Sequence, residues 1–239
     1  MNVIWLDTID STNSEALRRL ADVTSGTVIA AREQTAGRGQ RGNTWFTQPE
    51  QNLTFSIVLK FADAFPAARA VALNYLSSLA VAEFLRSFGV ACEIKWPNDV
   101  YVGKRKICGI LIENQLGADG LASSVIGIGI NINQREFPQL ANATSLALCT
   151  GKDEALEEVL AVFLEIFEGM LSRLDSPELW ERYASRLYRL GKTARYYDIL
   201  REEEFEGVIQ GVEPDGRLCI LDAGGERRHY RFKEVSYIL

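Results

Sequence analysis

A glycine- and arginine-rich loop, residues 37–42, constrains the fold more than any other segment, because both of its flanks have the pattern of β-strands. Residues 28–31 form an apolar run, and residues 53–60 alternate large apolar with smaller or polar side chains. The loop has the spacing of a dinucleotide-binding turn, Gly-x-Gly-x-x-Gly, but that turn requires a helix to begin at its glycines. Residues 43–49 lead into a second strand instead, so the sequence predicts a strand–loop–strand unit.

The residues of this loop are suited to binding an anion. Glycine allows backbone amides to approach a ligand closely or to adopt positive φ. Arg38 and Arg41 add guanidinium groups whose forked donors match carboxylate and phosphate. These six residues alone leave a solvated basic hairpin open as the alternative.

The remainder of the first 190 residues alternates predicted helices and strands. Pro66 and Gly89 bracket a long, mostly apolar helix, and further helical patterns cover residues 153–174 and 178–190. Strands are expected at residues 93–96, 100–102, 107–112 and 125–132.

The texture of the sequence changes at Gly191. From there to the end, short strand patterns are separated by turn residues such as Glu213-Pro214-Asp215-Gly216. We therefore expect two domains, one over residues 1–190 and a small β module over residues 191–239.

Composition excludes several classes of protein. The 239 residues carry a formal net charge of −6, which argues against non-specific binding to nucleic acid or to an anionic membrane. No apolar run approaches 18 residues and no secretory signal is evident at the start, so we expect a soluble, cytoplasmic protein.

Cysteine and histidine usage argues against metal clusters. No Cys-x-x-Cys pair occurs, so neither a zinc site nor a disulfide framework is expected. The single histidine, His229, is expected at the surface, and any chemistry must rely on Lys, Arg, Asp and backbone amides. The four cysteines are Cys92, Cys108, Cys149 and Cys219.

Polar residues gather near the predicted start of a short helix. Thr12 and Glu15 fit a capping box, with the helix continuing through Leu17. The hydroxyls and amide of Ser11, Thr12 and Asn13 are equally suited to hydrogen bonds with a polar ring.

Charged residues also stand at the ends of predicted strands. Asn98 and Asp99 either face a metal–nucleotide complex or form a common turn pair. Lys106 lies at the root of the apolar run 107–112, where it either extends to water or faces a bound anion. Gly127 and Gly129 interrupt the strand at 125–132, which weakens it unless a ligand or a neighbouring element lies against the backbone.

Taken in order, these motifs resemble the biotin protein ligases, which attach biotin to a lysine of biotin-dependent carboxylases. The resemblance covers the chain nearly end to end. Because its motifs begin at residue 10, the chain resembles the monofunctional members without an N-terminal DNA-binding domain. The matching segments are DSTN at 10–13, EQTAGRGQRGNTW at 33–45, KWPNDV at 95–100, KICGILIE at 106–113 and GIGIN at 127–131.

The resemblance implies an α+β fold. A mixed β-sheet with helices packed on it, related to class II aminoacyl-tRNA synthetases, would be followed by a small SH3-like β-barrel. It also implies that the biotin carboxylate attacks the α-phosphate of Mg-ATP, giving biotinyl-5′-AMP and pyrophosphate. A lysine of a biotin carboxyl carrier domain would then take the biotinyl group. The attacking carboxylate is already ionised, so no general base is required.

The resemblance also assigns site residues, with Lys106 and Arg38 as the catalytic cations. The residues it implies for biotin are Ser11, Thr12, Asn13, Gln34, Gly37, Arg38, Gly39, Gln40, Lys106, Gly109 and Gly127. Those it implies for ATP are Arg38, Arg41, Trp45, Asn98, Asp99 and Asn131. No firm metal ligand set is implied; Mg²⁺ would arrive on the ATP phosphates, near Asp99.

One departure and two alternatives follow from the same comparison. Gln40 and Asn43 stand where many family members have arginine, so we expect weaker retention of the adenylate. A lipoate or octanoate ligase of the same superfamily is one alternative, and a non-catalytic biotin or nucleotide sensor is the other. The expected partners are biotin, ATP and a carrier domain, without DNA or membrane; homodimer formation is left open.

Overall fold

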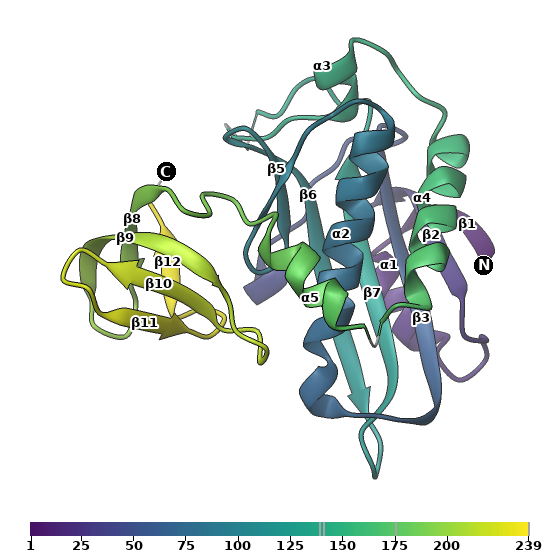
Figure 1. Ribbon diagram of the computed structural model, residues 1–239. Helices are drawn as coiled ribbons and strands as arrows, with labels where there is room; N and C mark the ends of the chain where they lie inside the picture. Colours follow the sequence, from purple (N-terminus) through teal and green to yellow (C-terminus); the bar gives the residue numbers. More distant parts are fainter. Residues whose placement is uncertain (139, 141, 175, 239) are drawn as a thin grey trace.

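The computed structural model describes residues 1–138, 140, 142–174 and 176–238, and these residues form two separate β-sheets (Figure 1). Helices α2, α4 and α5 cover one face of the larger sheet, and the smaller sheet lies to its side (Figure 1). No helix within the described residues is long and apolar enough to cross a membrane.

The larger sheet is mixed and has the strand order β1-β2-β3-β7-β6-β5-β4. Its first two strands are parallel and its other neighbours are antiparallel. The strands are β1 (Asn2–Ile9), β2 (Thr27–Gln34), β3 (Asn52–Phe65), β4 (Glu93–Lys95), β5 (Asp99–Val102), β6 (Arg105–Leu116) and β7 (Leu121–Asn131).

The helices are short except for two that pack on the sheet. They are α1 (Thr12–Arg18), α2 (Val71–Ser87), α3 (Leu146–Thr150), α4 (Leu156–Leu171) and α5 (Pro177–Ala184), with 3₁₀ turns η1 (Gln40–Gly42) and η2 (Ala67–Arg69). On the α2 and α4 side, the ring of Phe163 packs edge-on against Phe55 and Phe84, at centroid distances of 5.1 and 5.9 Å. These aromatic contacts centre the main core between the sheet and its helices.

The opposite face of the larger sheet carries α1 and a different kind of side chain. Ala16 of α1 packs on Ile29, Val58 and Val125, which form a small separate core. Beyond this core, the same face of the paired strands β3 and β7 presents small or polar residues, because alternate positions point to one side. These positions are Thr54, Ser56, Gly127 and Gly129.

The predicted strands are confirmed, but several predicted helix ends are wrong. α2 begins at Val71, after a 3₁₀ turn that follows Pro66. α4 covers only the middle of the predicted range 153–174. The helix predicted over 178–190 ends at Ala184, because the following residues leave it to exchange backbone hydrogen bonds with Ile94 of β4.

The predicted capping box is also wrong. Ser11 is the N-cap residue, its side chain makes no capping hydrogen bond, and Thr12 is already helical. Glu15 does not bond back to the cap; its carboxylate instead accepts hydrogen bonds from Arg18 and Arg19.

The smaller sheet confirms the predicted β module. Its order is β11-β10-β9-β8-β12, and all its strand pairs are antiparallel. Tyr196, Ile209, Leu218, Ile220 and Tyr230 form its buried side. The strands are β8 (Thr193–Asp198), β9 (Glu203–Val212), β10 (Leu218–Asp222), β11 (Arg227–Tyr230) and β12 (Val235–Tyr237).

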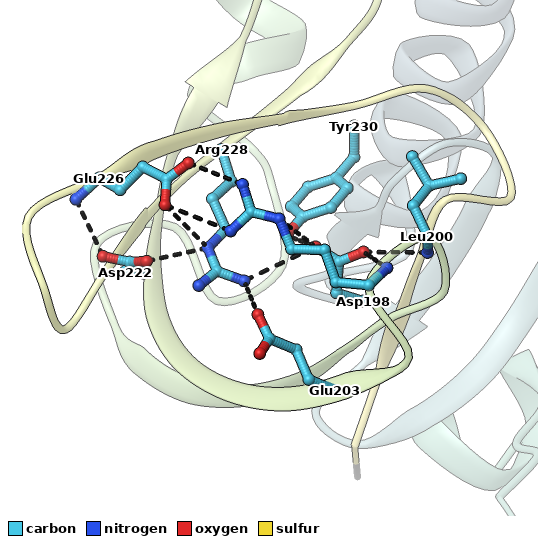
Figure 2. Close-up of polar contacts among 8 residues, drawn as sticks. Asp198, Leu200, Glu203, Asp222, Glu226, Arg228 and Tyr230 are labelled. Atoms are coloured by element: carbon cyan, nitrogen blue, oxygen red, sulfur yellow. Dashed lines mark hydrogen bonds and ion pairs between the residues drawn. The ribbon is translucent and has the colours of Figure 1, made fainter.

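A buried ionic network ties the strands of this module together (Figure 2). Figure 2 shows the guanidinium of Arg228 among the carboxylates of Glu203, Asp222 and Asp198, with contacts of 2.8, 2.8 and 3.6 Å. Asp198 also accepts a 2.8 Å hydrogen bond from the hydroxyl of Tyr230. Burial raises the pKa of Asp198, but backbone N–H donors and Tyr230 outweigh burial and hold it below its usual value.

Two tryptophans dock the hairpin between β9 and β10 onto the larger sheet. The indole N–H of Trp96 donates to the carbonyl of Gly216 at 3.0 Å, and that of Trp180 donates to Val212 at 2.8 Å. The smaller sheet is thereby placed beside residues 95–99, which were singled out in the sequence.

Candidate functional site

A cleft of about 390 Å³ lies on the α1 face of the larger sheet and reaches the smaller sheet. This volume is typical of sites for small organic ligands. Its walls are the start of α1, the loop 37–45, residues 95–99, strands β6 and β7, and residues 232–237 of the smaller sheet.

Glycines of β6 and β7 form the floor of the cleft, and side chains of neighbouring elements account for the two glycines that interrupt β7. A Cβ on Gly127 would lie 2.0 Å from Oδ1 of Asn13, and one on Gly129 would lie 2.3 Å from the ring of Trp45. Gly109 pairs with Gly129 across β6 and β7, and its Cβ would lie 3.0 Å from the same ring. Side chains of neighbouring elements, Asn13 and Trp45, therefore rest against the strand where side chains are missing.

One end of the cleft is a buried polar network at the start of α1. The amide of Asn13 donates to the carbonyl of Leu111 at 3.2 Å and to Glu113 at 2.9 Å, and its oxygen accepts from Ser56 at 2.6 Å. The side-chain oxygen of Gln34 accepts from the backbone N–H of Thr12 at 2.8 Å. These bonds fix amide and hydroxyl groups in one orientation, as recognition of a polar ring requires.

The loop 37–45 lies over the glycines of the cleft floor and is held by hydrogen bonds within its own backbone. The backbone N–H of Trp45 donates to the carbonyl of Gly37 at 2.9 Å, and the backbone N–H of Gly39 donates to the carbonyl of Asn43 at 2.7 Å. A Cβ on Gly37 would lie 2.3 Å from the carbonyl oxygen of Trp45, so this glycine is required by close backbone approach. Arg38 leaves the loop to form a bidentate ion pair with Glu113, at 2.8 and 3.1 Å.

Two buried polar atoms of this cover have no hydrogen-bond partner among the residues that the structure describes. They are Oε1 of Gln40 and Nε1 of Trp45. Gln40 does donate from its amide nitrogen to the carbonyl of Ile110, at 3.4 Å. Buried polar atoms almost always have a hydrogen-bond partner. Two that lack one beside a cleft are therefore candidates for hydrogen bonds with a ligand.

Cations dominate the other end of the cleft. Nζ of Lys106 lies 2.7 Å from a carboxylate oxygen of Asp99 and 5.5 Å from the ring of Trp45. Arg38, Lys95, Lys106 and Lys233 all line the cleft, whereas Asp99 is the one carboxylate among its described lining residues. The surplus of positive charge favours an anionic ligand.

Lys95 connects this cationic end to the smaller sheet. Its Nζ lies 4.9 Å from the ring centre of Tyr101 and 5.0 Å from that of Tyr237. Burial lowers the pKa of Lys95, and the nearby carboxylate of Asp99 opposes that shift.

The corner at residues 97–98 is held by hydrogen bonds from helices α2 and α5. The carbonyl of Pro97 accepts hydrogen bonds from Asn74 of α2 at 2.5 Å and from Tyr183 of α5 at 2.8 Å. The amide of Asn98 donates to the carbonyl of Ile110 at 2.6 Å. Asp99 is thereby presented to the cleft from a fixed backbone.

The structure brings together most of the residues that the sequence singled out. Ser11, Thr12, Asn13, Gln34, Arg38, Gly39, Gln40, Trp45, Asn98, Asp99, Lys106, Gly109 and Gly127 all line the cleft. Gly37 packs beneath Trp45 instead of lining it. Asn131 is buried outside the lining, and its amide donates to the carbonyl of Thr144 at 2.9 Å. The side chain of Arg41 lies outside what the structure describes.

Sequence reasoning missed two groups of site residues. Glu113 binds both Arg38 and Asn13, and its place directly after the apolar run 107–112 was the available signal. Phe232, Lys233 and Ser236 line the cleft from the smaller sheet, and no pattern in the sequence distinguishes them.

Comparison with known proteins identifies the family of this chain. The profile of the biotin/lipoate A/B protein ligase family matches residues 5–131. The solved structure of the biotin protein ligase from Aquifex aeolicus, in complex with biotin and ATP, superposes with a TM-score of 0.80. That structure is 32% identical and covers 98% of this chain and 97% of its own.

Curated relatives extend the similarity beyond the matched segment. The bifunctional ligase/repressor BirA of Escherichia coli is 32% identical, over 98% of this chain and 74% of its own length. The biotin–[acetyl-CoA-carboxylase] ligase of Paracoccus denitrificans is 30% identical, over 91% of this chain and 93% of its own length.

Proposed function

The chain belongs to the biotin/lipoate A/B protein ligase family, and we propose that within it this protein is an ATP-dependent biotin protein ligase. It activates biotin as biotinyl-5′-AMP and transfers the biotinyl group to a lysine of a biotin carboxyl carrier domain. One observation carries this proposal: a single cleft joins a hydrogen-bonding end suited to a ureido ring with a cationic end suited to carboxylate and phosphate.

The biotin ring fits the end of the cleft at the start of α1. Its ureido carbonyl accepts hydrogen bonds and its N–H groups donate them, matching the hydroxyl and amide groups of Ser11, Thr12, Asn13 and Gln34. The glycine floor leaves the backbone of β6 and β7 open to an apolar bicycle. The carboxylate at the end of the valeryl chain then faces Arg38 and Lys106.

In the first step, a biotin carboxylate oxygen attacks the α-phosphorus of ATP. The bond to the bridging oxygen breaks, and pyrophosphate leaves with the electron pair. Negative charge grows on the α-phosphate as the bond forms, and Lys106 exchanges its ion pair with Asp99 for that phosphate. A preorganised donor of this kind is typically worth about 3–4 kcal/mol in the transition state.

Arg38 supports the same step from the covering loop. Its guanidinium pairs with Glu113 in the absence of a ligand, and it is placed to move onto the biotin carboxylate and the α-phosphate. Arg41 is assigned to the departing phosphates on its motif, and Asn98 and Trp45 to the nucleotide side. Asn131 is assigned an indirect role, because its amide donates to the carbonyl of Thr144 outside the cleft.

Magnesium fits this cleft as a cation carried by ATP. Mg²⁺ characteristically uses one or two carboxylates together with substrate phosphates and water. Asp99, the one carboxylate of the described lining, would hold it there and would help it neutralise phosphate charge.

In the second step, the carrier lysine amine attacks the acyl carbonyl of the adenylate. The new amide forms, AMP leaves, and the amine gives up a proton. Residues 191–239, which we treat as a separate domain, close the cleft through Lys233 and Ser236 and lie where a carrier would approach.

Two features of the cellular setting are part of the proposal. We place the enzyme in the cytoplasm, where carrier domains and ATP meet. Its acidic net charge disfavours binding to DNA or to a membrane surface.

Substrate-dependent exchange of pyrophosphate into ATP tests the proposal and separates it from both alternatives. We expect exchange with biotin, and none with lipoate or octanoate at equal concentration. Exchange that depends on lipoate or octanoate would identify the other branch of the family. Tight biotin binding without any exchange would identify a sensor.

A further inference from the structure

Three side chains of the smaller sheet converge although nothing in their sequence spacing suggests it. Glu213, Cys219 and His229 each present one potential metal ligand, and these three atoms lie within 4.8 Å of one another. The absence of a Cys-x-x-Cys pair led to the expectation of no zinc site, but that argument counts ligands close in sequence. Here Glu213 directly follows β9, Cys219 lies in β10 and His229 lies in β11.

The register of the sheet explains why they meet. Cys219 pairs with His229 on one side and with Gly211 on the other, so their positions share one face. Glu213, two residues beyond Gly211, stands diagonally across from Cys219 on that face. Gly211 leaves room beside the thiol, because a Cβ there would meet nothing within 4 Å.

The face concerned is the outer one, which makes the burial of Cys219 informative. Its neighbours Leu218 and Ile220 belong to the core of the module and are fully buried. Cys219 points the other way, yet is only 6% exposed. Its sulfur lies within 4.8 Å of the ligand atoms of Glu213 and His229, so a thiol, a carboxylate and an imidazole gather at one place on this face.

The spacing of the ligand atoms suits a tetrahedral cation. Nδ1 of His229 lies 3.4 Å from Oε1 of Glu213. Zinc bonds of about 2.0–2.3 Å in tetrahedral geometry put neighbouring ligands roughly 3.3–3.5 Å apart. The sulfur of Cys219 lies within 4.8 Å of both of these atoms, and all three would bind one cation if the sulfur moved closer to them.

We propose that Glu213, Cys219 and His229 form a binding site for a zinc-class divalent cation on the outer face of the smaller sheet. Thiolate and imidazole select zinc over magnesium, which prefers oxygen ligands. Three protein ligands leave the fourth position to water. None of the three residues lines the cleft, so this site is distinct from the biotin and ATP site.

Binding of the cation must release a proton. The cation binds the thiolate, the neutral imidazole and the carboxylate, while the thiol proton leaves to solvent. The affinity therefore rises with pH.

The site stands at the root of the hairpin that docks on the larger sheet. Glu213 begins the turn whose Gly216 carbonyl accepts the hydrogen bond from Trp96. A cation there would cross-link three strands and brace that turn. It should therefore stabilise the folded chain in the absence of biotin and ATP.

Titration of the tag-free, metal-stripped protein with Co²⁺ tests the site, because a tetrahedral cobalt thiolate has a characteristic charge-transfer absorption. We expect that absorption in the wild type, its displacement by Zn²⁺, and its absence in Cys219→Ser. Cys149→Ser, which removes a cysteine of another part of the chain, should retain it. His229→Gln should weaken Co²⁺ binding by more than the roughly 10–100-fold that loss of an outer-shell contact costs.

A second readout protects the test against misfolded variants. The chain has one histidine, so the NMR signals of its imidazole report His229 alone and should shift on addition of Zn²⁺. Zn²⁺ should also raise the Tm of the wild type but not that of His229→Gln. An unchanged cobalt spectrum in Cys219→Ser, or an unshifted imidazole at saturating Zn²⁺, would overturn the proposal.

Discussion

At Gly127, the absence of a side chain decides where Asn13 can lie. Any Cβ there would overlap Oδ1 of Asn13. That oxygen accepts a hydrogen bond from Ser56, and the amide nitrogen of Asn13 donates to the carbonyl of Leu111, so the side chain is fixed in place. Gly127→Ala should therefore displace the amide and weaken biotin binding by about 1–3 kcal/mol, or roughly 5- to 150-fold in Kd. Calorimetric titration with biotin measures this effect.

The matched control is Gly169→Ala. A Cβ on Gly169, in α4, would meet nothing within 4 Å, so that variant should bind biotin as the wild type does. Equal Kd values for the two alanine variants would show that Asn13 does not contact the ligand.

Gln40 is one of the two positions, with Asn43, at which the motif resemblance leads us to expect arginine. Its amide nitrogen reaches Ile110 while its oxygen is buried without a partner among the described residues. Gln40→Arg adds a cation next to the adenylate phosphate, and we expect the intermediate to dissociate more slowly by about tenfold, the equivalent of one charge-assisted hydrogen bond. Stopped-flow measurement gives the rate of biotinyl-5′-AMP release from the wild type and from Gln40→Arg. Equal rates would show that residue 40 does not affect retention of the adenylate.

The presence of a residue in the site was predictable from the sequence where the residue belongs to a motif. It was not predictable where the residue enters the site through contacts with residues far away in the sequence. Lys106 and Asp99 were both expected in the site from their motifs, and they form an ion pair there. Glu113 was missed because its partners, Arg38 and Asn13, lie 75 and 100 residues away. Cys219 and His229 were set aside because their spacing carries no signal until β10 and β11 pair.

At the scale of elements, the hairpin between β9 and β10 fixes the smaller sheet against the larger. Gly216 has a φ of +90°, and a Cβ there would lie 2.8 Å from Cγ2 of Val71 in α2. Gly216→Ala should therefore cost both backbone strain and a steric clash. We expect the free energy of unfolding, measured in urea, to fall by about 1–3 kcal/mol more than backbone strain alone would lower it.

Gly225→Ala supplies the strain-only control. Gly225 has a similar φ of +85°, but a Cβ there would meet nothing within 4 Å. Equal losses in the two variants would mean that docking on α2 tolerates the added methyl group.

Strands were predicted more accurately than helix ends, for a physical reason. Strand patterns such as residues 53–60 reflect burial that the whole sheet enforces, and β3 covers them. The end of α5 depends on residues 186–188 leaving the helix to pair with Ile94, which lies about 90 residues earlier and carries no local signal.

At the scale of the whole molecule, acid should destabilise the fold. Hydrogen bonds from Arg18 lower the pKa of Asp10 to about 2. Burial raises the pKa of Asp198, but the backbone N–H groups of Leu200 and Arg201 and the hydroxyl of Tyr230 hold it below its usual value. A carboxyl with a lowered pKa stabilises the folded state fully above its unfolded value. That stability is lost as the pH falls through the lower folded value.

Thermal unfolding between pH 7 and pH 2.5 measures this dependence. We expect Tm to be nearly constant down to about pH 4.5 and to fall steadily below it. Asp198→Asn should lower Tm at pH 7 and reduce the fall in acid. A Tm that holds steady or rises on acidification would contradict the role assigned to these carboxylates.

The overall architecture was predictable because its two parts differ in pattern. The motif resemblance predicted the mixed sheet with packed helices, and the change from long helices to short strand patterns at Gly191 predicted the β module. Docking between the parts, through Trp96 and Trp180, was not predictable, because a tryptophan's hydrogen-bond partner is set only when the sheets meet.

The central claim is that the cleft activates biotin through Lys106 and passes it to a carrier domain. Transfer of biotin to a carrier domain, with ATP and Mg²⁺, tests it most directly when wild type, Lys106→Ala and Lys104→Ala are compared. Lys104 is exposed in the turn before β6 and is the matched control. We expect Lys106→Ala to reduce the rate by about 10²–10³-fold and Lys104→Ala to leave it within a few-fold of wild type. Undiminished transfer by Lys106→Ala would contradict the account.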